Sequence, residues 1–194
     1  SFNPVEVENF CLIRAPFHQP QAGFQYEIII EPKMSFGTGH HDTTWLMIKE
    51  MSCLNFVGKK IFDVGCGTGV LSILASKLGA KEVVALDIDE WAYHNTIENN
   101  QVNSVTNIKV LLGDISVVPA NSTFDIVLAN INRNIIVKDI NQYSKFLSEK
   151  GELLVSGFLD VDIPIIEAAA KKENLKLKNT QVKNHWTMLS FSKN

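Results

Sequence analysis

The chain has 194 residues, of which 45% are hydrophobic and 20% are charged, and its formal net charge is −3 at pH 7. This length and composition fit one domain with a sizeable core. The acidic balance and the lack of a basic block argue against nucleic acid as the direct substrate. No apolar run approaches the roughly 18 residues of a membrane-spanning helix, and no signal-peptide pattern opens the chain.

The three cysteines, Cys11, Cys53 and Cys66, are odd in number and lack C-x-x-C spacing. This pattern favours reduced thiols over a disulfide framework or a zinc site. We therefore expect a cytoplasmic protein without a metal ion, and we expect a monomer with no membrane partner.

The first part of the chain shows little regular pattern. Residues 1–23 hold three prolines and one short apolar stretch, which indicates a linker followed by an irregular strand. Residues 25–31 alternate between polar and apolar side chains and predict a strand. We therefore divide the chain into a lead-in segment, 1–24, and one domain, 25–194.

After residue 58 strand and helix patterns alternate. The predicted strands cover 60–64, 82–87, 107–112, 124–129, 152–157, 176–181 and 185–192, and the predicted helices cover 43–54, 70–78, 90–100, 133–146 and 163–173. Five strands alternating with helices, followed by a terminal pair, indicate an α/β fold with a mostly parallel sheet and a C-terminal antiparallel hairpin. Ligands of such sheets bind at the carboxyl ends of the strands, where the strand order switches.

A glycine-rich turn, Asp63–Gly69, joins a predicted strand to a predicted helix and reads Asp-Val-Gly-Cys-Gly-Thr-Gly. The glycines Gly65, Gly67 and Gly69 let the backbone approach a ligand, and the start of the following helix offers unpaired N–H groups. Asp87 closes the next strand 22 residues after Gly65, where an acidic side chain can accept hydrogen bonds from ribose hydroxyls. The turn therefore predicts a nucleotide-like cofactor.

Two details of the turn indicate which cofactor binds. Val70 makes the spacing G-x-G-x-G, whereas dinucleotide sites have G-x-G-x-x-G. A carboxylate at Asp63 would repel a pyrophosphate, but it suits a ligand with an ammonium group, such as S-adenosylmethionine. Asp63 could instead be a solvated turn residue or a cap, and we interpret Cys66 as a small turn residue without chemistry.

Further candidates lie where other predicted strands end. Asp87 binds ribose or caps the next helix, and Ile88 covers an adenine or belongs to the core. Asp114 accepts a hydrogen bond from the adenine amino group or is a turn residue. Asn130 ends an apolar strand, where a side-chain amide has no packing reason to lie, so we interpret it as functional. If the reaction is methyl transfer to an amine, the Asn130 oxygen and the Ile131 carbonyl would accept from the amine and aim its lone pair.

The stretch 36–44 reads Phe-Gly-Thr-Gly-His-His-Asp-Thr-Thr. Its glycines predict a flap that closes over the cofactor and excludes water. If the reaction is methyl transfer to an amine, Thr38 and His41 could face that amine. We interpret His40 as an exposed loop residue and Asp42 as the N-cap of the following helix. A metal role for the two histidines is not expected, because no third ligand lies nearby in the sequence.

Together, Asp63–Gly69, Asp87-Ile88 and Asn130 resemble the motifs of the class I S-adenosylmethionine-dependent methyltransferases. Within that superfamily, the stretch 36–44 resembles the signature loop of the ribosomal protein L11 methyltransferases (PrmA type). The resemblance extends to Leu154-Val155-Ser156-Gly157 and to Trp186, and it covers most of the chain from about Arg14 onward.

The resemblance implies a Rossmann-like seven-stranded sheet and an enzyme that methylates amino groups, on a lysine side chain or an N-terminus, of a large-subunit ribosomal protein. It implies that Thr44, Gly65, Asp87 and Asn130 contact S-adenosylmethionine. The full set of expected cofactor residues is Phe36, Gly37, Thr44, Asp63, Gly65, Gly67, Gly69, Asp87, Ile88, Asp114 and Asn130. The expected catalytic residues are Asn130, Thr38 and His41.

Two departures from the family pattern leave other functions open. The family carries a small N-terminal substrate-recognition domain for which this chain has no room, so we expect a trimmed chain. Asn132-Arg133-Asn134 is also more polar than the usual continuation after Asn130-Ile131. The alternatives are a methyltransferase for another protein, a small molecule, a glutamine amide or RNA, a nicotinamide oxidoreductase, and a cofactor-binding module that is inactive without its missing domain.

Overall fold

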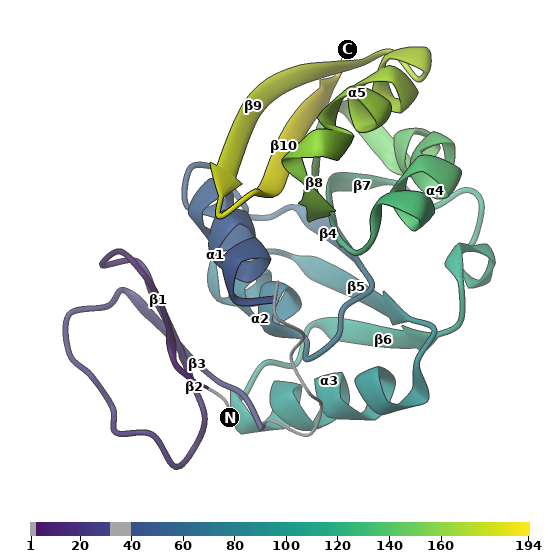
Figure 1. Cartoon of the computed structure of the whole chain (residues 1–194). Helices are drawn as coiled ribbons and strands as arrows, with labels where there is room; N and C mark the ends of the chain where they lie inside the picture. The colour runs from purple at the N-terminus through teal and green to yellow at the C-terminus, as the bar shows by residue number, and fades with distance from the viewer. Residues whose placement is uncertain (1–2, 32–39) are drawn as a thin grey trace.

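A computed structural model describes residues 3–31 and 40–194 of the chain. Its centre is a seven-stranded sheet with the strand order β6-β5-β4-β7-β8-β10-β9 (Figure 1). The strands are β4 (Lys60–Val64), β5 (Glu82–Asp87), β6 (Ile108–Leu112), β7 (Phe124–Asn130), β8 (Leu147–Leu159), β9 (Leu175–Lys183) and β10 (Trp186–Lys193). The first five run parallel, and β10 lies antiparallel between β8 and β9. The predicted seven-stranded α/β sheet with a C-terminal hairpin is confirmed.

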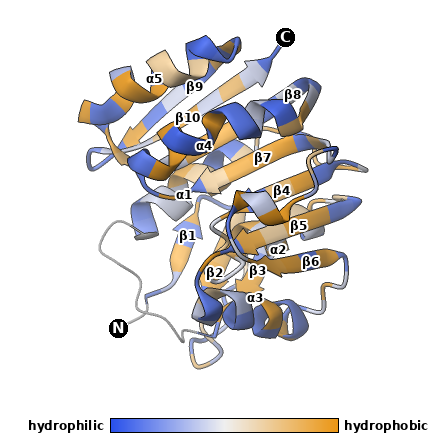
Figure 2. Ribbon diagram, turned by 90° about the vertical axis from the view of Figure 1, so that its right-hand side faces the viewer, coloured by the Kyte–Doolittle hydropathy of each residue, from blue (hydrophilic) through white to orange (hydrophobic). Residues whose placement is uncertain are grey.

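Helices cover both faces of this sheet. They are α1 (His40–Met51), α2 (Val70–Lys77), α3 (Glu90–Val102), α4 (Arg133–Phe146) and α5 (Ile163–Lys172), with short 3₁₀ turns η1 (Ile115–Val117) and η2 (Asp160–Asp162). Successive strand residues point to opposite faces. Ile61 therefore lies in the core that α1 and α2 cover, whereas Phe62 lies in the core that α4 and α5 cover. Burial on both faces explains the continuous hydrophobic runs inside β5 (83–86) and β7 (126–129), shown in Figure 2.

The order of the strands places the functional site. From β4 the chain moves outward through β5 to β6, and it then returns to the other side of β4 with β7. The switch in direction lies between β4 and β7, whose register pairs Val64 with Ala129. The glycine turn after β4 and Asn130 at the end of β7 therefore emerge side by side at the same edge of the sheet.

The start of α1 differs from the sequence prediction. The helix begins at His40, so Asp42 lies within its first turn and is not the N-cap. The Asp42 carboxylate accepts a hydrogen bond of 3.2 Å from Asn184 in the β9–β10 turn. The negative charge of Asp42 still interacts favourably with the positive end of the helix dipole. A carboxylate at the N-cap and one in the first turn share this interaction.

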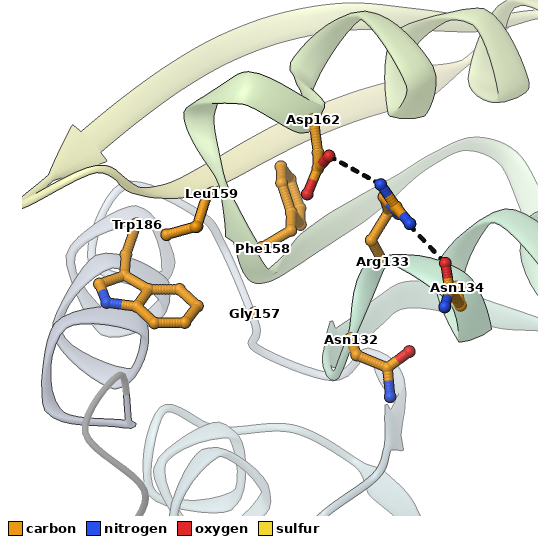
Figure 3. A pocket seen from close by; sticks show the side chains of 8 residues that line it. All are labelled: Asn132, Arg133, Asn134, Gly157, Phe158, Leu159, Asp162 and Trp186. Carbon is orange, nitrogen blue, oxygen red and sulfur yellow. Dashed lines mark hydrogen bonds and ion pairs between the residues drawn. The ribbon is translucent and has the colours of Figure 1, made fainter.

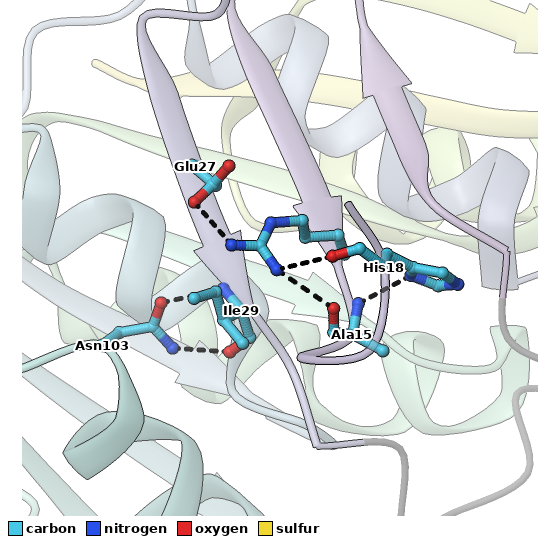
Figure 4. A network of polar contacts seen from close by, with 6 residues as sticks. Ala15, His18, Glu27, Ile29 and Asn103 are labelled. Carbon is cyan, nitrogen blue, oxygen red and sulfur yellow. Dashed lines mark hydrogen bonds and ion pairs between the residues drawn. The ribbon is translucent and has the colours of Figure 1, made fainter. Parts of the chain in front are cut away.

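The strand predicted in 25–31 is present, and residues 1–24, predicted as a linker with one irregular strand, contain two strands. The start of the chain is therefore more regular than predicted. It forms a three-stranded sheet of β1 (Val5–Val7), β2 (Cys11–Arg14) and β3 (Tyr26–Ile29), in which β2 pairs antiparallel with β1 and parallel with β3. The buried Arg14 of β2 connects this strand to β3 through an ion pair with Glu27 at 3.2 Å. Its guanidinium also donates to the carbonyls of Ala15 and His18, in the segment that follows β2 (Figure 4). The strands β1 and β2 have only three and four residues and lie among prolines, so their sequence pattern was weak.

Side-chain amides of α3 attach this small sheet to the main domain. Asn103 donates to the Ile29 carbonyl at 2.7 Å and accepts from the Ile29 N–H at 2.9 Å (Figure 4). One and two turns earlier, Asn99 accepts from the Glu31 N–H and Asn95 donates to the Glu31 carbonyl. The three asparagines are spaced by four residues, so they lie on one face of α3. Their amides bond the backbone N–H and C=O groups of residues 29 and 31, as a neighbouring strand would.

Candidate active site

The glycine turn after β4 is fixed by the ends of β4 and β5. The backbone N–H groups of Gly65 and Cys66 both donate to the Leu86 carbonyl, at 2.7 Å and 2.9 Å. Gly65 has a φ of +70°, and a Cβ atom there would lie 2.2 Å from Ile131 Cγ2. Glycine is required at position 65 for both reasons, and the contact places the turn directly against the segment that follows Asn130.

Helix α3 holds the other side of the turn. Thr96 Oγ1 donates to the Gly67 carbonyl at 2.9 Å, and Asn99 Nδ2 donates to the Thr68 carbonyl at 2.8 Å. Both side chains are completely buried. The outer side of the turn is open toward the described residues, since none of them has an atom within 4 Å of a Cβ atom added at Gly67. The backbone at Gly67 is therefore rigidly held and accessible to a ligand.

Asp87, at the end of β5, reaches the turn with its carboxylate. Its Oδ2 accepts from the Gly67 N–H and its Oδ1 accepts from the Asp89 N–H, both at 2.9 Å. The helix cap is Asp89, which accepts from the Trp91 N–H. The next residue, Ile88, has 74% of its surface exposed, so it is not a core residue. An exposed apolar side chain thus directly follows the residue whose carboxylate reaches the turn.

Asp63 lies beneath the turn and not on its surface. The residue is 1% exposed, and its carboxylate accepts a hydrogen bond of 2.6 Å from Ser72 Oγ of α2. Burial, with a smaller contribution from the negative charge of Asp87, raises the pKa of the Asp63 carboxyl to about 7, although the Ser72 hydrogen bond opposes the rise. A carboxyl with this pKa changes its charge near neutral pH.

Cys66 fits its interpretation as a turn residue without chemistry. It is 6% exposed, and its sulfur lies 3.3 Å from Thr96 Oγ1. Burial and the neighbouring Asp63 raise the pKa of the Cys66 thiol well above its usual value. The thiolate form that nucleophilic chemistry needs is therefore suppressed. All three cysteines are free thiols.

Asn130 and Ile131 lie beside the turn. Asn130 is half-buried, and its side-chain amide makes no hydrogen bond with the described residues. Its Cα atom pairs with Ser156 of β8, and the Ile131 N–H donates to the Ser156 carbonyl at 3.0 Å. Gly157 has a φ of +102°, and a Cβ atom there would lie only 1.8 Å from the Ile131 carbonyl oxygen. The absence of a side chain at Gly157 thus creates the space that the Ile131 peptide occupies.

The remaining predicted residues fall into three groups. Thr44 is buried in α1 and His41 is half-buried in its first turn. Asp114 is exposed and caps η1 by accepting from the Ser116 backbone and hydroxyl, which hold the pKa of its carboxyl below the usual value. Phe36, Gly37 and Thr38, and with them the predicted flap, lie outside the described residues.

A hollow of about 430 Å³, which we call the acceptor-side hollow, opens next to Asn130 at the ends of β7 and β8 (Figure 3). It is lined by Asn132, Arg133, Asn134, Gly157, Phe158, Leu159, Asp162 and Trp186. Arg133 Nη1 pairs with Asp162 Oδ1 at 3.0 Å and joins the start of α4 to η2. The Trp186 ring faces Asn132 and Arg133 across the hollow (Figure 3).

The sequence analysis missed several residues of this site. Ser72, Thr96 and Asn99 contact the cofactor turn or its buried acid, and Asp162 lines the hollow. A signal was present for two of them. Thr96 and Asn99 lie three residues apart on one face of a helix whose other face carries the exposed Glu90, His94 and Gln101. Buried polar side chains need hydrogen-bond partners. A helix face with polar side chains that points inward therefore indicates bonds to backbone groups, which here belong to the turn.

The model of the family described as ribosomal protein L11 methyltransferase (PrmA) matches residues 1–194. The chain belongs to this family. A ribosomal protein L11 methyltransferase of Porphyromonas gingivalis is 45% identical over 191 residues, which are 98% of this chain and 66% of that protein. One of Bacteroides fragilis is 45% identical over 190 residues, which are 98% of this chain and 68% of that protein. The predicted family is thus confirmed.

Solved structures agree with the fold of the family. A crystal structure of ribosomal protein L11 methylase from Lactobacillus delbrueckii subsp. bulgaricus superposes with a TM-score of 0.90 and 27% identity, and the match covers 100% of both chains. A methyltransferase from Pyrococcus furiosus, at 18% identity, has a TM-score of 0.71 over 86% of this chain and 89% of its own, and it supports the fold alone. The chain spans about two-thirds of the length of the curated relatives. In the described part of the chain, no helix is long and apolar enough to cross a membrane.

Proposed function

We propose that the chain is the catalytic part of a methyltransferase that transfers methyl groups from S-adenosylmethionine to amino groups of ribosomal protein L11. One observation carries the proposal: the contact of Gly65 with Ile131 joins the glycine turn to the Asn130 segment. A cofactor on the turn and an amine at Asn130 would then be neighbours. Family membership supports ribosomal protein L11 as the acceptor, on a lysine side chain or at the N-terminus.

The residues around the turn fit S-adenosylmethionine. Asp87 offers a carboxylate to ribose hydroxyls, the exposed Ile88 offers an apolar surface to an adenine, and the open face of Gly67 admits the ligand to the backbone. Thr44, Gly69 and Asp114 belong to the same proposed set. Asp63 acts from beneath the turn, where its negative charge favours a bound cation. When bound, the cofactor supplies a methyl group on a positively charged sulfur.

The protein's own residues must then align a neutral amine. A lysine side chain has an ordinary pKa of about 10.4, so its deprotonation costs about 4 kcal/mol near neutral pH. The Asn130 side-chain oxygen has no partner among the described residues and is free to accept from the amine. The Ile131 carbonyl is the second acceptor. Two acceptors fix the direction of the lone pair, and alignment is the main contribution that an enzyme makes to such a displacement. His41, together with Thr38, is proposed to face the same amine.

The first test is calorimetric titration with S-adenosylmethionine and, separately, with NAD. Binding of S-adenosylmethionine alone is expected, followed by transfer of radioactive methyl groups to purified ribosomal protein L11. Binding of NAD alone would refute the proposal. Cofactor binding without transfer would leave a cofactor-binding module that requires the remaining third of its relatives' length.

The second test concerns Asn130. We expect Asn130→Ala to lose methyl transfer while it retains affinity for S-adenosylmethionine within a few fold, because its oxygen serves the amine. Asn121→Ala, in an exposed loop, is the control and should retain full turnover. Full turnover of Asn130→Ala would exclude the proposed role of this side chain.

A further inference from the structure

We infer that Arg133 is a specificity-determining residue that binds the carboxylate of an acidic side chain close to the methylated amine in the acceptor. The inference rests on the proposed function, because it names a feature of the acceptor that would enter the acceptor-side hollow. The unused hydrogen-bond donors of the Arg133 guanidinium support this role.

Three of the five guanidinium N–H donors of Arg133 are left for a ligand. Nη1 donates to Asp162 Oδ1 at 3.0 Å, and Nε donates to Asn134 Oδ1 at 3.1 Å. The Nη2 group makes no hydrogen bond with the described residues, and a second Nη1 hydrogen is also unused. The Arg133 side chain is 40% exposed and lines the hollow (Figure 3). It therefore presents a partly unused cationic fork to an open site.

The two existing contacts hold this fork in place before a ligand arrives. Asp162 binds one end of the guanidinium, and the pair connects the start of α4 to η2. A side chain that is already ordered loses less conformational entropy when it binds. The Asp162 side chain is only 19% exposed, and its hydrogen bond uses one donor on Nη1 of Arg133. Another edge of the guanidinium is therefore free to bind a second carboxylate. The nearby Asp160 is paired with His185 at 3.1 Å and does not occupy Arg133.

A carboxylate is the group that this fork binds best. Guanidinium and carboxylate match in geometry and form charge-assisted hydrogen bonds, which are stronger than bonds to a neutral carbonyl. Among the described residues that line the hollow, Arg133 has the only cationic side chain. Arg133 follows Asn130 by three residues, so the two side chains belong to neighbouring parts of the site. An extended acceptor chain advances by about 3.3–3.6 Å per residue. The acidic side chain of the acceptor would therefore lie within a few residues of its methylated amine.

The experiment compares two short acceptors, acetyl-Gly-Glu-Lys-Glu-Gly-amide and acetyl-Gly-Gln-Lys-Gln-Gly-amide. Binding is measured by calorimetry with S-adenosylhomocysteine present, and methyl transfer is measured with S-adenosylmethionine. We expect the acidic peptide to bind more tightly and to show a higher kcat/KM, by roughly ten- to a hundredfold, as charged hydrogen bonds imply. Arg133→Ala should abolish this preference.

Matched variants separate recognition from general electrostatics. Lys178→Ala removes another exposed ion pair, Lys178 with Glu152 at 3.2 Å, and should keep the preference. Asp162→Asn keeps Arg133 and an oxygen that can accept from its Nη1, so it should keep the preference for the acidic peptide. An equal loss for both peptides in Arg133→Ala would mean that Arg133 binds a main-chain carbonyl, and it would overturn the inference. Equal binding of both peptides by the unmodified protein would overturn it as well.

The two measurements also distinguish the inference from the function on which it rests. If the unmodified protein transfers no methyl group but binds the acidic peptide through Arg133, the proposed function fails and the recognition stands. If it methylates ribosomal protein L11 but Arg133→Ala changes neither preference nor binding, the function stands and the inference is overturned.

Discussion

Asp87 and Gly67 are joined by a hydrogen bond of 2.9 Å between the Asp87 carboxylate and the Gly67 N–H, which connects the end of β5 to the glycine turn after β4. The other carboxylate oxygen accepts from the Asp89 N–H. Each carboxylate oxygen can accept more than one hydrogen bond, so both keep capacity for a hydroxyl group. One side chain thus fixes the turn and can also contact a ligand that lies over it.

Replacement of Asp87 by Asn should weaken the binding of S-adenosylmethionine by about ten- to a hundredfold, because an amide has one acceptor oxygen where the carboxylate uses two. Calorimetric titration measures the change. Asp89→Asn is the matched control, since Asp89 caps α3 two residues later and Asn is an equally good cap. Equal affinities of Asp87→Asn and the unmodified protein would show that Asp87 serves the turn alone.

The raised pKa of Asp63 makes stability dependent on pH. In the unfolded chain the Asp63 carboxyl titrates near its ordinary value of 3.8, and in the folded protein it titrates at about 7. The folded state therefore holds an extra proton between these values, and stability falls as the pH rises from about 4 to about 7. The largest possible effect is about 4 kcal/mol.

Asp63→Asn removes this ionisation while it retains an acceptor for Ser72. We expect the variant to gain free energy of unfolding relative to the unmodified protein at pH 8 and little at pH 4, as urea denaturation at the two pH values would measure. A gain of the same size at both values would contradict the titration of Asp63. In the unmodified protein, a bound cation should favour the ionised carboxylate, so affinity for S-adenosylmethionine should rise with pH near 7.

The sequence predicted the main sheet well, because its strands are buried on both faces and its helices have clear ends. The predicted helix 133–146 coincides with α4 (Arg133–Phe146), where Asn132 caps the helix. At the start of the chain the strand 25–31 was predicted, but its assembly with β1 and β2 into a three-stranded sheet was not. Its stability comes from distant partners, such as Asn103 on Ile29 and Trp45 Nε1 on the Glu6 carbonyl. No local pattern encodes contacts over 39 to 74 residues.

The structure brings Gly65 and Asp87 together, as their spacing in the motif indicated, because motif spacing reflects local backbone geometry. Their contacts with a cofactor remain predictions. Asp63 shows the limit of this reasoning, since its sequence position does not reveal whether the carboxylate faces a ligand or, as observed, Ser72 beneath the turn. The ion pair of Arg133 with Asp162 spans 29 residues and two elements, so only the fold could reveal it.

Asn99 connects two segments that are far apart in the sequence. Its oxygen accepts from the Glu31 N–H in a partly buried bond, and its amide donates to the Thr68 carbonyl in a buried one. Asn99→Asp keeps the first bond and places a carboxylate against the Thr68 carbonyl. We expect a loss of about 1–3 kcal/mol in the free energy of unfolding. Gln101→Ala, at an exposed position of the same helix, should change it by less than about 0.5 kcal/mol.

Gly157→Ala tests the space that the Ile131 peptide occupies. The new Cβ atom would meet the Ile131 carbonyl at 1.8 Å, so this peptide must shift, and Asn130 must shift with it. Gly23→Ala is the matched control, because Gly23 has a similar φ of +99° and none of the described residues has an atom within 4 Å of the added Cβ. Both variants carry the backbone strain of about 1–3 kcal/mol. Only Gly157→Ala should also lower kcat for methyl transfer, and steady-state kinetics at saturating S-adenosylmethionine would measure this. Equal kcat values in the two variants would show that the position of the Ile131 carbonyl is not important for the reaction.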